Sequence, residues 1–555
     1  MTSVNPLTRL FQVLKLEKKE VSSIYLYSIF NGLMQLSVPL GVQAIIGFVI
    51  GSEMVSSIYI LILLVIIGVL FVGVFQIKQM QTIEKIQQKI FVRYAFEFAE
   101  KIPSLDLKNI DRIYLPELVN RFFETQNIQK GLTKLLLDVP ISSIQIFLGL
   151  LLLTLYNPIF IILGFILFVF TIAMLYLTAS NGLKTSLKES YYKYEVVAWL
   201  QEIGRVVKSF KYGLSNSLSL KKTDDILVNF LDSRIQHFKI LLLQYKVLVV
   251  FKVLITAIML GFGTYLLVIQ ELNIGEFIAA EIVVLTLISA VEKLISSLDS
   301  VYDVLTGLDK IAIVTDGKLD TKGSIKINST PIGIELIDLN FHYGDGNNVL
   351  ENINLNIPPN STVCITGPEG SGKSTLMNLI AGTYSDFTGV LMYNNLPINN
   401  YDLELLRSKI GFHLNQDDIF KGTVLENINM GNNAITNDKI MELAFLLGIE
   451  NFVFNLKNGL DTESIAMGKF LPSNVIKKIL LLRSLLGSPQ LILLEDPCIG
   501  LEEIAKEKVN AYLLSKKINA TVIISSNDMQ IAKKCDYRIK MSKGKAVLVK
   551  NTTNE

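Results

Sequence analysis

The chain has 555 residues, of which 50% are hydrophobic and 18% charged, and its formal net charge is +2. An average soluble protein carries about a quarter charged residues. Together with a mean hydropathy of +0.44, this composition excludes a disordered chain, a nucleic-acid-binding tail and an ordinary cytosolic enzyme. The near-neutral charge indicates no nucleic-acid partner. The three cysteines, Cys364, Cys498 and Cys535, predict no disulfide framework.

The first 300 residues alternate between charge-free runs and charge-rich stretches. A membrane-spanning helix needs about 20 mostly apolar residues. Each charge-free run is long enough for one span, and the run 139–183, divided by an Asn157-Pro158 turn, is long enough for two. A sixth span follows, although three glutamates interrupt it. The six spans are expected near residues 22–50, 57–77, 138–156, 159–179, 245–269 and 275–295.

Basic residues distinguish the two ends of these spans. The short connections between spans contain no Lys or Arg, whereas the N-terminal segment 1–20 and the long connections 78–137 and 180–244 contain many. Because positive charge marks the cytoplasmic side, we expect a multi-pass protein of the inner (plasma) membrane whose C-terminal part is cytoplasmic. Both long connections have apolar residues at helical spacing. They are either solvated helical hairpins or elements that transmit movement to a cytoplasmic domain.

A phosphate-binding motif follows the membrane region. Gly367-x-x-x-x-Gly372-Lys373-Ser374 stands between a predicted strand and a predicted helix, which is the context that the motif requires. Its glycines allow backbone N–H groups to close around phosphates, Lys373 reaches the β- and γ-phosphates, and the Ser374 hydroxyl is a Mg²⁺ ligand. The expected nucleotide-binding residues here are Gly367, Pro368, Glu369, Gly370, Ser371, Gly372, Lys373, Ser374 and Thr375.

A second strand supplies two carboxylates. Residues 491–494 are apolar and are followed by Glu495 and Asp496. In a P-loop fold a strand of this kind holds the Mg²⁺ carboxylate, and a neighbouring residue positions the attacking water. We therefore expect Glu495 to be a metal ligand and Asp496 to be catalytic. The alternative is a buried strand with two solvated acids at its tip.

Several further sequence stretches occur in the same order along the chain as the motifs of a known family. With six spans and a P-loop domain, the chain resembles an ATP-binding-cassette exporter half-transporter over essentially its whole length. The resemblance implies that Tyr343 stacks on adenine and that Asn415 stands at the Q-loop position, where it contacts metal and attacking water. It places Ser473 and Asn474 in the signature region, which binds the partner's nucleotide, with Ser473 able to cap the helix. It places Asn527 at the position of the switch histidine.

The same resemblance implies the domain organisation. The fold class is an all-α six-helix transmembrane domain followed by an α/β P-loop nucleotide-binding domain. The expected parts are a cytoplasmic N-terminal segment (1–20), the transmembrane domain (21–305), a linker (306–330), the ATP-binding domain (331–550) and a tail (551–555). ATP and Mg²⁺ are the implied cofactors.

Several positions depart from the family pattern, and all of them concern hydrolysis. The acidic pair Glu495-Asp496 reverses the usual order, Asn527 cannot carry a positive charge, and Pro472-Ser473-Asn474 changes the signature. Losing a positioned polar group at a phosphoryl-transfer site costs about 10²-fold or more in rate. We therefore predict an ABC-type transport ATPase with slow hydrolysis. Since both halves of a composite site are altered on one chain, we favour a homodimer.

Short stretches of the membrane half resemble type I secretion ATPases, the haemolysin-exporter group. They include residues 37–46, 115–121 and 199–202. This resemblance implies a peptide or protein cargo passed to a periplasmic adaptor and an outer-membrane channel. The chain begins about twenty residues before its first span, so we expect no N-terminal peptidase-like domain. A lipid or small-molecule exporter, and an ATP-binding membrane scaffold without transport, remain as alternatives.

Overall fold

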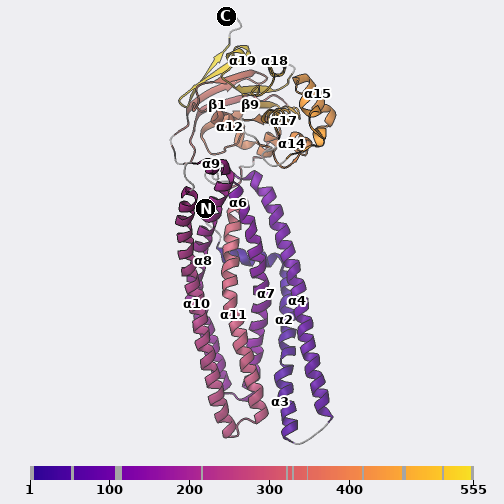
Figure 1. Ribbon diagram of the computed structural model, residues 1–555, viewed down its shortest axis with the longest axis vertical. Coiled ribbons are helices and arrows are strands. Elements are labelled where there is room, and N and C mark those ends of the chain that lie inside the picture. The colour runs from indigo at the N-terminus through magenta and orange to yellow at the C-terminus, as the bar shows by residue number, and fades with distance from the viewer. Residues whose placement is uncertain are drawn as a thin grey trace. The chain divides into compact units, whose positions relative to one another are not determined.

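The structure is a computed structural model of the chain (Figure 1). It describes residues 5–51, 56–106, 115–213, 217–320, 323–327, 330–344, 346, 348–414, 418–464, 471–515 and 518–551. The chain forms two compact units, one comprising Met1–Pro103 with Leu115–Gly317 and the other Ser104–Tyr114 with Lys318–Glu555.

Helices are the only regular secondary structure in the described residues of the first unit, and its long helices run side by side (Figure 1). Its elements are α1 (Pro6–Leu16), α2 (Lys18–Gln35), α3 (Ser37–Ile50), α4 (Ser57–Lys101), η1 (Ile102–Ser104), α6 (Leu115–Asn120), η2 (Arg121–Phe123), α7 (Glu124–Tyr156), α8 (Phe160–Arg205), α9 (Val207–Lys211), α10 (Ser217–Val268) and α11 (Ile274–Thr315).

Six helical segments in the described residues are long and apolar enough to cross a membrane. They are Lys18–Ile50, Ser57–Ser104, Leu115–Tyr156, Phe160–Arg205, Ser217–Val268 and Ile274–Thr315. The 52 residues of α10 correspond to about 78 Å of helix, more than twice the roughly 30 Å of a bilayer's hydrocarbon core. The helices therefore continue beyond the spans into the two long connections, as predicted.

Close packing of α7 against α11 forms the centre of this unit. A Cβ on Gly131 would lie 2.4 Å from Val304 Cγ2, and a Cβ on Gly149 would lie 2.9 Å from Leu287 Cδ2. Small residues at these positions let the two helix backbones approach. The predicted turn between α7 and α8 is confirmed, because Asn157 is extended and its Oδ1 accepts a 3.0 Å hydrogen bond from the Ile159 N–H.

The second unit is built on sheets. A six-stranded sheet has the order β12-β11-β3-β10-β9-β6, in which β11, β3, β10, β9 and β6 are parallel and β12 is antiparallel to β11. The strands are β3 (Thr362–Thr366), β6 (Ile410–His413), β9 (Leu491–Glu495), β10 (Thr521–Ser525), β11 (Tyr537–Ser542) and β12 (Lys545–Lys550).

A four-stranded sheet of order β2-β1-β4-β5 and a β7-β8 pair complete the strands. These strands are β1 (Ile334–Phe341), β2 (Leu350–Ile357), β4 (Thr388–Tyr393), β5 (Leu396–Pro397), β7 (Gly422–Thr423) and β8 (Glu463–Ser464). The helices of this unit are α12 (Lys373–Ile380), η3 (Ile398–Asn400), α13 (Leu403–Arg407), α14 (Val424–Asn429), α15 (Asn437–Leu447), α16 (Asn451–Phe454), η4 (Gly459–Asp461), α17 (Ser473–Leu485), α18 (Glu503–Leu513) and α19 (Met529–Lys534).

The central parallel strands are buried on both faces. Val363 and Ile365 of β3 belong to one hydrophobic core, while Cys364 between them belongs to a second. Strands β9 and β10 alternate in the same way. Continuous apolar strands of this kind are typical of a parallel sheet covered on both sides. The carboxyl ends of β3, β9 and β10 therefore meet at one edge, where polar residues follow each strand.

The predicted fold class is confirmed: six apolar helices precede a domain of parallel strands and helices. The exact domain boundaries stay predictions. Helix α11 continues without a break to Thr315, so the first ten residues of the segment 306–330, expected to be a linker, are helical. Hydrophobic side chains continue on α11 through this stretch, and Leu308, Ile311 and Val314 are buried, so the helix is extended by packing rather than ended by a break in the sequence.

Candidate nucleotide-binding site

The glycine-rich loop joins β3 to α12 at the carboxyl end of a central strand. Gly370 and Gly372 have φ values of +73° and +98°, a conformation that favours residues without a Cβ. A Cβ on Gly367 would lie 2.4 Å from the carbonyl oxygen of Met541, so no larger residue fits there. The loop backbone is therefore free to close around a phosphate at the start of a helix. The predicted loop residues 367–375 all lie at this strand end.

One polar side chain of the loop has partners that an anion would replace, and another has no partner among the described residues. Lys373 Nζ donates hydrogen bonds to the carbonyl oxygens of Gly367 (2.8 Å) and Pro368 (2.9 Å). Ser371 is 2% exposed, and its Oγ has no hydrogen-bond partner among the described residues. Buried hydroxyl groups almost always have a hydrogen-bond partner, so this one indicates a bound group that the loop would hold. Gly370 opens onto free space, since no described atom lies within 4 Å of a Cβ built on it. These features fit a phosphate chain held by the loop.

The two predicted metal ligands within the described residues are in contact. Ser374 Oγ, at the start of α12, donates a 2.6 Å hydrogen bond to Glu495 Oε1, at the end of β9. Hydroxyl and carboxylate oxygens are the donors that Mg²⁺ prefers, so this pair fits the ion that the motif implies. Asn415, the third predicted metal ligand and a predicted catalytic residue, lies outside the described residues.

Asp496 is held in an unusual backbone conformation. Its φ is +41°, a left-handed value that costs a non-glycine residue about 1 kcal/mol or more. Backbone hydrogen bonds maintain it, because its N–H donates to Ser525 O (2.9 Å) and its carbonyl accepts from the Ile499 N–H (3.1 Å). The backbone of Asp496 is thereby fixed at the strand edge, beside the end of β10.

Asn527, the second predicted catalytic residue, connects two parts of the site. Its Oδ1 accepts a 3.2 Å hydrogen bond from the Gly367 N–H, at the first glycine of the loop. Asn527 and Asp496 also line one cavity of about 490 Å³. The structure thus brings both described catalytic candidates together, next to the phosphate-binding loop.

This cavity contains residues that the sequence analysis did not single out. Lys506 from α18, Cys498 and Asp528 line it together with Asp496 and Asn527. Burial raises the pKa of the Cys498 thiol to about 11, so the thiol is neutral at physiological pH. Lys506 comes eleven residues after Glu495, on a separate helix. Only the return of the chain after β9 brings it to the cavity, so no local motif marks it.

Tyr343 is placed beside the first turn of α12. Its hydroxyl is 3.1 Å from Thr375 Oγ1, and its ring makes edge contacts with Phe341 (5.0 Å between centroids) and Tyr384 (5.6 Å). The ring is 38% exposed, so part of its surface is open to a ligand. A half-exposed aromatic ring next to a phosphate loop suits the predicted stacking on a base.

The predicted signature residues stand at the start of a helix other than the one that follows the phosphate-binding loop. Ser473 and Asn474 are the first two residues of α17, and no hydrogen bond between described residues joins them to the phosphate-binding loop. The expectation that Ser473 caps this helix is wrong. Pro472 occupies the N-cap position without a side-chain hydrogen bond, because its fixed backbone starts the helix one residue earlier and leaves Ser473 inside it.

Family models match both halves of the chain. A model described as the ABC transporter transmembrane region matches residues 23–291, and a model described as ABC transporter matches residues 350–499. The chain belongs to the ATP-binding-cassette (ABC) transporter family. It is therefore a multi-pass membrane protein with a nucleotide-binding domain.

Curated relatives of this ABC transporter include proteins named for translocation and transport. It is 27% identical over 292 residues to the alpha-hemolysin translocation ATP-binding protein HlyB of Escherichia coli O157:H7 (52% of this chain, 41% of that protein). It is 23% identical over 347 residues to the pediocin PA-1 transport/processing ATP-binding protein PedD of Pediococcus acidilactici (61% and 48%). The aligned part of this ABC transporter spans about half the length of these relatives or less.

A solved structure has the same fold over nearly the whole chain. The structure of a bacterial Atm1-family ABC exporter with ATP bound superposes with a TM-score of 0.85 and 15% sequence identity, covering 96% of this chain and 94% of that one. At this identity the likeness concerns the fold alone. It agrees with the six-helix domain followed by a nucleotide-binding domain that the sequence predicts.

Proposed function

We propose that this ABC transporter is one half of a dimeric exporter, which binds ATP with Mg²⁺ and hydrolyses it slowly to drive export across the inner membrane. The contact between Ser374 Oγ and Glu495 Oε1 carries this proposal. It joins the end of the phosphate-binding loop to the carboxylate strand, as a metal–nucleotide site requires. When bound, Mg²⁺ neutralises charge on the phosphate oxygens.

Each residue of the site has a distinct proposed task. Lys373 leaves its two carbonyl partners and pairs with the phosphates, while Ser374 and Glu495 hold Mg²⁺. Tyr343 stacks on the adenine, supported by Thr375. Asp496 accepts a hydrogen bond from the attacking water, and its fixed backbone limits where its carboxylate can reach.

The proposed slow rate of hydrolysis follows from the side chains of Asp496 and Asn527. Asp496 is one methylene shorter than glutamate, so its carboxylate reaches less far towards the water. The side-chain carbonyl oxygen of Asn527 already accepts a hydrogen bond from the Gly367 N–H. The asparagine side chain also carries no positive charge that could stabilise the γ-phosphate. Each loss of a positioned polar group costs about 10²-fold or more in rate. The hydrolysis that remains depends on the carboxylates of Glu495 and Asp496 and on Lys373.

Ser473 and Asn474 make no hydrogen bond to the phosphate-binding loop of their own chain within the described residues, and we assign them to the other subunit of a dimer. They would complete the nucleotide site of the partner subunit, and two identical copies would give two identical sites. A peptide or protein cargo is the proposed substrate, supported by the similarity to HlyB and PedD, whose names refer to alpha-hemolysin and pediocin. A periplasmic adaptor and an outer-membrane channel are the corresponding proposed partners.

An ATPase assay of the reconstituted chain tests this proposal. We expect slow hydrolysis that exceeds that of Lys373→Ala and requires Mg²⁺, while Lys421→Ala, a change of an exposed lysine outside the site, keeps the unaltered rate. A rate equal to that of Lys373→Ala, with ATP binding retained, would favour the membrane scaffold. Stimulation of the rate by phospholipid vesicles but not by candidate cargo peptides would favour a lipid exporter.

A further inference from the structure

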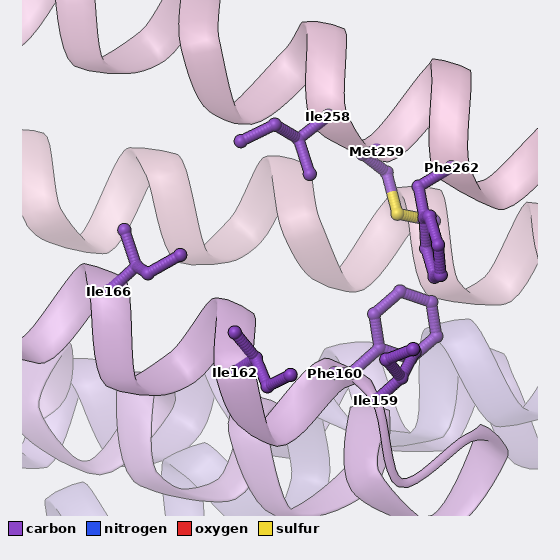
Figure 2. A pocket seen from close by; sticks show the side chains of 7 residues that line it. All are labelled: Ile159, Phe160, Ile162, Ile166, Ile258, Met259 and Phe262. Carbon is purple, nitrogen blue, oxygen red and sulfur yellow. The ribbon is translucent and has the colours of Figure 1, made fainter.

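An apolar groove runs along the outside of two membrane helices. Its outer part, of about 250 Å³, lies between the start of α8 and the outer part of α10. Figure 2 shows Ile162 and Ile166 on one side of this space and Ile258, Met259 and Phe262 on the other. A second cavity, of about 340 Å³, shares Ile166 and Ile258 with the first and continues it along the same helix pair. The two form one groove, which we call the α8–α10 groove.

Among the described residues, a single charged side chain lines this groove, at its inner end. Lys246 lies beside Val250 and Leu254, whose side chains are 59% and 56% exposed, while the stacked rings of Phe170 and Phe251 (4.2 Å) form the floor. Within the described residues, Lys246 has no ion pair or hydrogen bond. The nearby Lys252 differs, because it pairs with Glu292.

The position of Lys246 corresponds to the membrane surface. It precedes the end of α10 at Val268 by 22 residues, or about 33 Å of helix, which is close to the roughly 30 Å of the hydrocarbon core. The long basic connections lie on this same side, which is the cytoplasmic side by the distribution of positive charge. A lysine at this depth extends its ammonium group to the level of the lipid phosphates.

The inner cavity has the length of one lipid chain. From Lys246 to Ile258 is 12 residues, or about 18 Å of helix, whereas one leaflet of the hydrocarbon core is about 15 Å deep. An acyl chain that starts beside Lys246 would therefore reach Ile258 near the middle of the membrane. Basic groups between membrane helices on the cytoplasmic side are suited to anionic lipid headgroups.

We propose that the α8–α10 groove is a binding site for an anionic phospholipid of the cytoplasmic leaflet, with Lys246 at its phosphate and one acyl chain along Val250, Leu254 and Ile258. The positive charge of Lys246 favours an anionic over a neutral headgroup, because the other lining residues make only apolar contacts.

Native mass spectrometry of the full chain, released from detergent micelles, tests this site. The probes are phosphatidylglycerol and phosphatidylcholine with identical acyl chains. We expect the first phosphatidylglycerol to bind about fivefold more tightly than phosphatidylcholine, the effect of one basic side chain near a membrane surface. Lys246→Gln removes this preference and Lys246→Glu reverses it. The matched control Lys239→Gln, two turns earlier on α10 and outside the groove, retains it.

A second pair of variants tests the apolar part. Leu254→Trp fills the groove and is expected to weaken the binding of both lipids, whereas Leu260→Trp, an exposed leucine on the same helix outside the groove, leaves it unchanged. A preference for phosphatidylglycerol that survives Lys246→Gln, or that Lys239→Gln also removes, would overturn the proposal. So would a Leu254→Trp variant that binds lipid normally but loses the dimer, which would identify a second copy of the chain as the occupant.

Discussion

Ser374 Oγ and Glu495 Oε1 lie 2.6 Å apart, although 121 residues separate them in the sequence. The parallel register explains the contact, since β3 and β9 both flank β10 and end at the same edge of the sheet. The longer side chain of glutamate, compared with aspartate, spans the remaining distance to the hydroxyl.

Removing the charge of Glu495 tests its proposed role as a metal ligand. We expect Glu495→Gln to lower ATP hydrolysis about 10²-fold or more, because the amide is a poorer ligand for the ion that balances the phosphate charge. Nucleotide binding without Mg²⁺ is expected to stay unchanged, and a fluorescent ATP analogue with EDTA measures it. Equal losses of binding with and without Mg²⁺ would contradict a metal role. Glu442→Gln, which removes an exposed acid of α15 outside the site, is the control.

Backbone strain at Asp496 gives a second prediction. Because its φ is +41°, Asp496→Gly is expected to raise the free energy of unfolding of the nucleotide-binding domain by about 1 kcal/mol. The same change removes the carboxylate and is expected to abolish hydrolysis above the Lys373→Ala background. Thermal denaturation and the ATPase assay measure the two effects. A glycine variant that is less stable than the unaltered chain would show that side-chain contacts, not strain, dominate at this position.

Extending the side chain at the same position gives a third prediction. Asp496→Glu places the carboxylate one methylene further from the backbone, and we expect kcat to rise about tenfold while the KM for ATP changes little, as for a group that acts in the transition state. Asp528→Glu lengthens a neighbouring acid of the same cavity and serves as the matched control. A fall in kcat with Asp496→Glu would mean that the shorter residue is already in the best position.

Helix packing in the membrane unit gives a fourth prediction. A Cβ on Gly182 of α8 would lie 2.2 Å from the Tyr302 ring of α11, whereas a Cβ on Gly261 of α10 meets nothing within 4 Å among the described residues. We expect Gly182→Ala to destabilise the unit by about 1–3 kcal/mol through overpacking. Gly261→Ala should be neutral or stabilising, since alanine favours a helix over glycine by about 1 kcal/mol. The measurement compares the thermal unfolding midpoints of both variants in the same detergent. Equal shifts of the two midpoints would contradict the packing argument.

The pH dependence of Cys498 gives a fifth prediction. Because burial raises the pKa of its thiol to about 11, alkylation of the folded protein is expected to be slow at pH 8 and to rise about tenfold per pH unit until it levels off near that value. The folded state favours the protonated thiol, so the stabilising effect is present below the usual cysteine pKa and is lost as the pH rises through 11. Mass spectrometry after timed alkylation measures the rate, with unfolded protein as the control. A rate that levels off near pH 9 would show a normal thiol.

The local chain pattern predicted the membrane helices and the nucleotide loop. Charge-free runs define spans because a charge in hydrocarbon is costly, and the Asn157-Pro158 turn separates two of them as expected. Part of the glycine motif is explained by local geometry, since Gly370 and Gly372 adopt positive φ values within the loop itself. The strand before this loop, the helix after it and the strand that ends at Glu495 were also predictable from local patterns.

Contacts between distant segments were not predictable in this way. The extension of α11 to Thr315 and the partnering of Asn527 with Gly367 depend on how segments pack. The arrival of Lys506 beside Asp496 and the groove that ends at Lys246 depend on it as well. The sequence determined which chemical groups this protein carries and which segments are apolar enough for a membrane, because those properties are local. Tertiary structure decided which of these groups meet, because strand register and helix packing bring together residues that no spacing in the chain relates.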